Sequence, residues 1–132
     1  MNLDGQLGSG QTGTSPVDGN LKTIAAQGKP TLWAIPPAGI LGLGAAMQDG
    51  ANKYGVFNWR ETGVTASVFY NAMLRHLMDW REGQDFATDS GISHLAHIMA
   101  SGAILLDAQA LGILNDDRPK RQDFNPVYHP GS

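Results

Sequence analysis

Two apolar patterns of helical period, separated by a short polar stretch, constrain the fold of this chain more than any other feature. Over residues 66–82 one face recurs every three or four positions, at Phe69, Ala72, Met73, His76, Leu77 and Trp80. A second stripe lies within residues 91–111, at Leu95, Ile98, Gly102, Leu105 and Gln109. Gly83 is placed as a C-cap and Ser90 as an N-cap. The spacing predicts two antiparallel helices joined by a short loop.

A third helix is predicted upstream of these two. It should begin at Pro36-Pro37, because a proline in the first turn of a helix loses no hydrogen bond there, and should end at Gly50 or Gly55. Residues 56–65 are predicted to form a loop. The fold class is therefore all-α, with three main helices. Their broad apolar faces exceed what three helices can cover, so we expect a homo-oligomeric helical bundle.

The remaining sequence predicts a division into three parts. Residues 1–28 form a Gly/Ser-rich N-terminal tail, residues 29–114 the helical domain, and residues 115–132 an extended, charged C-terminal tail. A net charge of −3 argues against a protein that binds a nucleic acid polymer through bulk electrostatics. The N-terminus has no pattern of a secretory signal, and the most apolar stretch, residues 35–47, is too short to span a bilayer. We therefore expect no membrane partner.

Three of the four histidines and several carboxylates gather around the predicted junction of the second and third helices. His76 lies on an apolar face, and His94 and His97 share one face of the next helix. Glu82, Asp85 and Asp89 occupy the junction. Carboxylates with a histidine suit Mg²⁺ or Mn²⁺, whereas the free N–H groups of a helix N-terminus suit a phosphate. The plainer alternative is a buried, hydrogen-bonded histidine beside ordinary capping residues.

A second polar cluster alternates aromatic rings with cations and amides. Residues 52–60 read NKYGVFNWR. Lys53, Arg60 and, further along, Arg75 supply positive charge; Tyr54 and Trp59 supply rings on which a base can stack; Asn58 offers both a donor and an acceptor. These residue types predict a nucleotide site, the alternative being that the aromatic residues only hold a loop against the core.

Three motifs stand out: KYGxxNWR at residues 53–60, RHLxxW at 75–80 and SGxxHLxH at 90–97. Together they resemble a phage-borne family, the dATP/dGTP diphosphohydrolase N-terminal domain family, and the resemblance covers about residues 29–120. It implies a small helical protein acting on purine deoxynucleotides in the cytoplasm of an infected bacterial host. Related MazG-type enzymes cleave a nucleoside triphosphate to the monophosphate and pyrophosphate with a divalent metal. The resemblance places eight matching positions in the nucleotide pocket: Lys53, Asn58, Arg60, Arg75, His76, Asp89, His94 and His97.

One departure from the MazG pattern leaves two functions open. The chain has no EExxE sequence, the motif that supplies metal-binding carboxylates in those enzymes. The leading hypothesis is a purine (d)NTP pyrophosphohydrolase in which Glu82, Asp85 and Asp89 hold Mg²⁺ or Mn²⁺ and His76, His94 or His97 orients water. The alternative is a metal-free sponge that sequesters a signalling nucleotide and so blocks host anti-phage immunity. A purely structural oligomer would leave the histidines and arginines without a role.

Overall fold

The computed structural model describes residues 18–123, which separate into two compact units with the division between Pro37 and Ala38. The described part of the first unit contains one short helix, α1 (Leu21–Ala26), whose start is capped by the Asn20 side chain accepting from the Lys22 N–H. This helix lies inside the predicted tail of residues 1–28, and residues 1–17 lie outside the described residues. The three-part division predicted from sequence stays a prediction.

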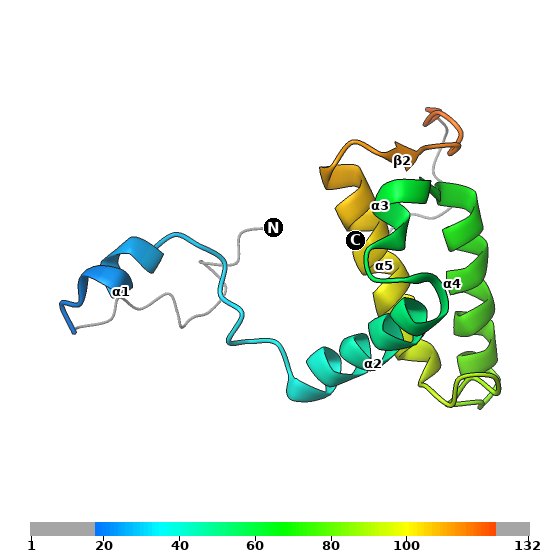
Figure 1. Ribbon diagram of the computed structural model, residues 1–132, viewed down its shortest axis with the longest axis horizontal. Coiled ribbons are helices and arrows are strands. Elements are labelled where there is room, and N and C mark those ends of the chain that lie inside the picture. Colours follow the sequence, from blue (N-terminus) through cyan, green and yellow to red (C-terminus); the bar gives the residue numbers. More distant parts are fainter. Residues whose placement is uncertain (1–17, 124–132) are drawn as a thin grey trace, which may run out of the picture. The chain divides into compact units, whose positions relative to one another are not determined.

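Three long helices build the second unit, which confirms a mainly helical fold. They are α2 (Pro37–Tyr54), α4 (Ala66–Arg81) and α5 (His94–Ala110). In Figure 1, α4 and α5 run antiparallel side by side, as predicted, and α2 crosses the first half of α5. Helix α2 begins at Pro37 and ends directly before Gly55, whose φ of 97° favours glycine. None of the helices within residues 18–123 combines the length and apolar character needed to cross a bilayer.

The segment predicted as a loop, residues 56–65, contains regular structure. It forms helix α3 (Asn58–Thr62) and strand β1 (Val64–Thr65). Strand β1 pairs in parallel with β2 (Leu114–Asn115), so the start of the predicted extended tail is part of a small sheet. Asp117 then accepts hydrogen bonds from the backbone N–H and hydroxyl of Ser67 and caps α4. The prediction was wrong here because the strand's partner lies 50 residues away along the chain.

The start of the third long helix also differs from the prediction. Ser93, not Ser90, is the N-cap of α5, and its hydroxyl accepts from the Leu95 N–H. The chain before it forms a tight turn in which Phe86 pairs with Ser93 and the Ala87 N–H donates to the Ile92 carbonyl. Ser90 therefore lies inside this turn, and α5 begins three residues later than the sequence indicated.

The core of the helical unit is built largely from alanines. Among residues 38–123 the buried apolar side chains are Ala46, Trp59, Val64, Ala66, Ala87, Ala96, Ala100 and Ala108. Six of them form two clusters: Ala46, Ala96 and Ala100 where α2 crosses α5, and Val64 and Ala108 around Trp59. Small side chains let the helices approach closely: a Cβ added at Gly42 would lie 3.5 Å from the Ala96 Cβ.

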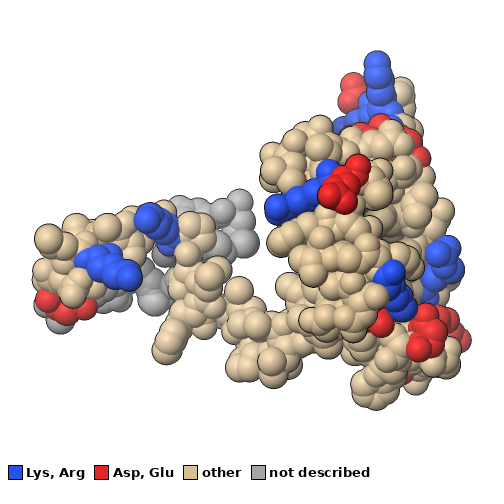
Figure 2. Space-filling model, viewed as in Figure 1, with Lys and Arg blue, Asp and Glu red and all other residues tan. Residues whose placement is uncertain are grey.

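The faces of α4 and α5 that are buried therefore coincide only in part with the apolar faces predicted from sequence. On α4, Phe69, Ala72, Met73 and His76 face the interior, whereas Leu77 and Trp80 are 46% and 43% exposed. The exposed apolar residues form two further stripes, Tyr70, Leu74, Leu77 and Met78 on α4 and Leu95, Met99 and Leu106 on α5. Figure 2 shows charged residues only in small separate groups on the visible face of this unit. Much of that face is thus uncharged.

Candidate functional site

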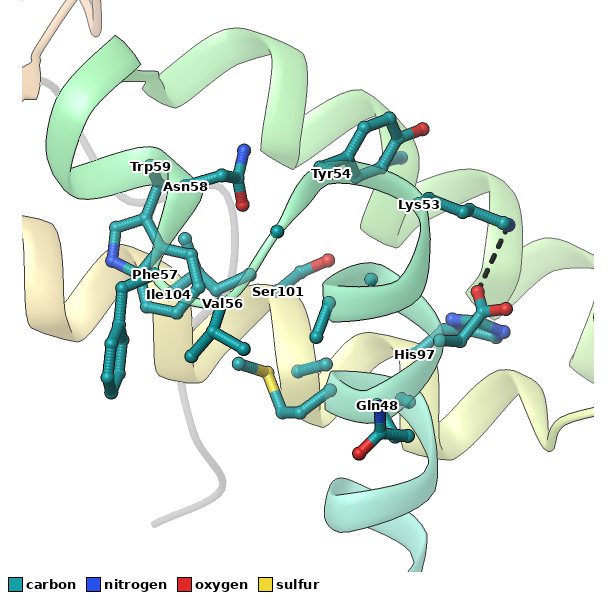
Figure 3. A pocket seen from close by; sticks show the side chains of 18 of the residues that line it. Gln48, Lys53, Tyr54, Val56, Phe57, Asn58, Trp59, His97, Ser101 and Ile104 are labelled. Atoms are coloured by element: carbon teal, nitrogen blue, oxygen red, sulfur yellow. Dashed lines mark ion pairs between the residues drawn. The ribbon is translucent and has the colours of Figure 1, made fainter.

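A cleft of about 740 Å³ opens between α2, α4, α5 and the segment that joins α2 to α3. Figure 3 shows residues 53–59 curving around it, with Phe57 and Trp59 at one end and Lys53 and His97 at the other. Its apolar lining includes Met47, Phe69 and Ile104. Ligand pockets for small molecules have volumes of roughly 300–1,000 Å³ and combine apolar walls with a few polar groups. The cleft has both properties.

The aromatic end of the cleft is held in place by a carboxylate on α5. Asp107 accepts from the indole N–H of Trp59 at 2.8 Å and from Nε and Nη2 of Arg60 at 2.9 Å each. The Arg60 guanidinium also lies 4.3 Å from the centre of the Phe57 ring, which packs edge-on against Trp59. Arg60 lowers the pKa of Asp107 most strongly, followed by Trp59.

Phe57 adopts a left-handed backbone conformation that is unusual for a residue with a side chain. Its φ is 57° at the N-cap of α3. Such a conformation costs free energy, of order 1–3 kcal/mol, and persists where the surrounding contacts impose it. The Phe57 ring contacts Arg60 and Trp59, and Asp107 bonds to both of these, so the four side chains form one connected group.

The polar end of the cleft carries an ion pair and two imidazoles. The Lys53 ammonium lies 3.0 Å from a carboxylate oxygen of Asp49, one turn earlier on α2. The hydrogen bond and charge of Asp49 raise the pKa of Lys53, and Asp89 adds a smaller effect. Because two aspartates but one lysine line the cleft, its lining is net negative when the imidazoles are neutral.

The three histidines predicted from sequence form one cluster. His76 and His97 stack with ring centres 4.7 Å apart and an interplanar angle of 11°. The Nδ1 atoms of His76 and His94 lie 2.7 Å apart, within hydrogen-bond distance. His94 is buried, at 2% exposed, and its Nε2 lies 2.7 Å from Oε1 of Gln84. His97 Nε2 bonds to the Ser90 hydroxyl at 2.8 Å.

Burial favours the neutral form of two of these imidazoles. It lowers the pKa of His76, and the neighbouring rings of His97 and His94 lower it further. Burial also lowers the pKa of His97, against the opposing effect of the Asp49 and Asp89 carboxylates. Near neutral pH both rings are therefore able to accept a proton.

The structure brings together seven of the twelve site residues predicted from sequence and separates the other five. Those lining the cleft are Lys53, Tyr54, Asn58, Trp59, His76, Asp89 and His97. Arg75 and His94 line a smaller adjoining cavity of about 200 Å³, which shares His76 and Asp89 with the cleft. Arg60 is engaged with Asp107. Glu82 pairs with Arg81 at 2.6 Å, and Glu82 and Asp85 line neither cavity.

The three carboxylates predicted to hold a metal are therefore not gathered at one point. Only Asp89 lies at the cleft, and Asp85 contributes its carbonyl oxygen, which accepts from the His94 N–H. Within residues 18–123, no group of three or more His, Cys, Asp or Glu side chains is arranged to hold a metal ion. Two carboxylates, Asp49 and Asp89, do line the cleft. Mg²⁺ in proteins is commonly held by one or two carboxylates together with substrate phosphates.

Sequence reasoning missed four residues that shape the site. Asp49 contacts Lys53, Asp107 holds Trp59 and Arg60, and Gln84 and Ser90 bond to His94 and His97. The sequence did contain a signal for Asp49: it ends the apolar stripe of α2 and precedes Lys53 by four residues, a spacing that brings two side chains together on a helix. The partners of Asp107, Gln84 and Ser90 depend on the tertiary fold.

The fold and cleft define a small helical protein with a ligand-sized pocket lined by aromatic, imidazole and charged side chains. Comparison with family models identifies the group: a model described as "dATP/dGTP diphosphohydrolase, N-terminal" matches residues 20–118. The chain belongs to this family, as its motifs suggested. No curated protein and no solved structure matches the chain. The family name points to a function related to dATP/dGTP diphosphohydrolysis.

Proposed function

We propose that the cleft binds a purine deoxynucleoside triphosphate and cleaves it to the monophosphate and pyrophosphate. The observation that carries this proposal is the polarity of the cleft from one end to the other. Aromatic rings of Phe57 and Trp59 stand at one end, and Lys53 and His97 at the other. A nucleotide has the same two-part character, a flat apolar base and a charged phosphate chain.

The aromatic end supplies contacts suited to a base. Phe57 is half exposed and Tyr54 is 70% exposed, so their rings are accessible for stacking. Asn58 lines the cleft beside them and offers an amide donor and acceptor to a base edge. Trp59 has a different role, because its side chain is buried and its indole N–H already donates to Asp107. It forms the wall against which a base would lie.

The charge of the polar end favours a nucleotide that arrives with a divalent cation. A lining with two aspartates and one lysine repels a bare triphosphate. A Mg²⁺ or Mn²⁺ ion held by Asp49, Asp89 and phosphate oxygens would supply the missing positive charge and polarise the phosphoryl group. This charge balance favours a metal-dependent hydrolase over the metal-free sponge.

The imidazoles supply the proton acceptor for hydrolysis. Water forms a new bond to the α-phosphorus as the bond from that phosphorus to the bridging oxygen of the β-phosphate breaks. The bonding electrons leave with pyrophosphate, and the proton of the water passes to a neutral imidazole at the cleft, His76 or His97. Lys53 stabilises negative charge that develops on the phosphate chain.

A product analysis tests the proposal. Purified protein is incubated with dGTP or dATP, with and without Mn²⁺, and then denatured, and the nucleotides are separated. We expect metal-dependent release of monophosphate and pyrophosphate, lost in Lys53→Ala and retained in Lys120→Ala, whose lysine is exposed outside the cleft. Recovery of bound but intact nucleotide would refute hydrolysis and support the sponge. Absence of both binding and turnover would refute the site itself.

We also propose that the protein is a homo-oligomer. The apolar stripe of Tyr70, Leu74, Leu77 and Met78 on α4 and that of Leu95, Met99 and Leu106 on α5 are each 38–69% exposed. Exposed apolar surface of this extent is typical of a subunit interface. Light scattering should give a mass above that of one chain, and Leu74→Glu with Leu106→Glu should reduce it to one. A single-chain mass for the unmodified protein would contradict this proposal.

A further inference from the structure

A hydrogen-bonded series of side chains leads from the loop after α4 into the cleft. Oε1 of Gln84 lies 2.7 Å from Nε2 of His94, and Nδ1 of His94 lies 2.7 Å from Nδ1 of His76. His94 is the only polar or charged side chain that is buried among residues 18–123. His76, at the other end of the series, lines both cavities.

The first member of the series dictates the proton positions of the others. The carbonyl oxygen of an amide only accepts, so Nε2 of His94 must carry its proton. At a pH where the imidazole of His94 carries a single N–H, Nδ1 of His94 is then an acceptor. The short contact between the two Nδ1 atoms requires one donor, which must be Nδ1–H of His76. Nε2 of neutral His76 is consequently left with its lone pair.

We infer that Gln84 and His94 act as positioning residues that hold His76 in the tautomer whose Nε2 accepts the proton of the attacking water. Among residues 18–123, Nε2 of His76 has no hydrogen-bond partner, in contrast to Nε2 of His97, which is bound to Ser90. The stacked His97 ring restricts the rotation that would exchange the two nitrogens of His76. The inference rests on the proposed function for the identity of the reaction.

This arrangement gives different roles to three histidines that the sequence alone does not distinguish. His76 is the proton acceptor, and Asp89 lines the same two cavities. His94 is buried and transmits the orientation set by Gln84. His97 is fixed by Ser90 and packs flat against His76. Lowering of the His76 pKa by burial keeps the accepting form populated near neutral pH.

The tautomers are measurable without any substrate. Two-bond ¹H–¹⁵N correlation spectra distinguish protonated from unprotonated ring nitrogens, and His76→Gln assigns the His76 signals. At about pH 8, above the ordinary histidine pKa, we expect His94 as the Nε2–H form and His76 as the Nδ1–H form. The reverse pair, with Nε2–H on His76, would overturn the inference even if the protein hydrolyses dGTP.

Variants at Gln84 test whether the loop residue sets the tautomer. Gln84 is exposed, so Gln84→Met should fold, which circular dichroism checks. It should give mixed tautomers of His76 and lower kcat about tenfold or more, given the size of general-base effects. Gln84→Glu keeps an acceptor and should restore both, and Gln109→Met is the matched control. An unchanged His76 spectrum in Gln84→Met would refute the relay. Normal tautomers without any turnover would instead refute only the proposed function.

Discussion

Replacing Trp59 with alanine should destabilise the helical unit more than any other single truncation of an aromatic side chain in it. Trp59 is 7% exposed and packs with Val64 and Ala108 in the larger of the two core clusters. A buried aromatic side chain removes roughly 150–250 Å² from water, and at about 25 cal/mol per Å² this gives an upper bound of about 4–6 kcal/mol. Measured Trp→Ala changes in cores cost about 3–5 kcal/mol. We adopt that range.

The assay is urea unfolding followed by far-UV circular dichroism, because removal of a tryptophan alters fluorescence directly. All variants are compared at one protomer concentration, since association shifts the midpoint. Trp33→Ala is the matched control: Trp33 is 95% exposed, so the loss should be within about 0.5 kcal/mol. Trp59→Phe separates the two contributions, because it keeps a ring but loses the N–H that Asp107 accepts. It should cost about 1–2 kcal/mol.

Equal losses for Trp59→Ala and Trp33→Ala would refute the assignment of Trp59 to the core. That outcome would indicate that the Trp59 ring is exposed in the cleft and available to stack on a base. A second informative outcome is the response of nucleotide binding. Because Trp59 forms the wall of the cleft, Trp59→Phe should weaken dGTP binding only slightly. A large loss of dGTP binding would indicate that the indole stacks directly on the base.

Three further predictions follow from the site. Gly44 lies inside α2 with nothing within 4 Å of an added Cβ, so Gly44→Ala should raise the free energy of unfolding by about 0.5–1 kcal/mol in the same urea assay. Folding lowers the pKa values of His76 and His97, so the free energy of unfolding should be greatest above the unfolded histidine pKa of about 6.5 and should fall as the pH drops below that value. His76→Gln should therefore flatten the pH dependence of the unfolding midpoint. An unaltered pH dependence in this variant would contradict the prediction. Arg75 lines the cavity that adjoins the cleft, so Arg75→Ala should weaken dGTP binding about 10- to 100-fold by calorimetry while Arg81→Ala does not.

The helices were predictable because each has a local signature. The periods of α4 and α5, the proline at the start of α2 and the glycines after α2 and α4 are read within one or two turns of chain. Strand β1 was missed because two residues, Val64 and Thr65, acquire their pairing from Leu114 and Asn115. A two-residue strand has no period of its own.

The site was predictable in composition but not in connectivity. Residues of the aromatic-cation alternation at 53–59, together with three residues around the predicted helix junction, His76, Asp89 and His97, are the seven predicted residues that line the cleft. The metal prediction for Glu82 and Asp85 was based on closeness along the chain, but neither residue lines the cleft or the adjoining cavity in the folded protein. The sequence predicted only that Arg60 supplies a positive charge. In the fold this charge binds Asp107, which lies 47 residues further along the chain and could not be identified from local sequence.

The central claim is that this cleft receives a purine deoxynucleotide with its base at the aromatic end and its phosphates at the imidazole end. Titration of ¹⁵N-labelled protein with dGTP and Mg²⁺ tests it directly through amide chemical shifts. The account predicts concentration-dependent shifts for residues 47–59, for His76 and for residues 97–104, with the backbone around Arg118 unchanged. Shifts confined to surfaces outside the cleft, or no shifts at millimolar dGTP (roughly the weakest binding of interest), would contradict it.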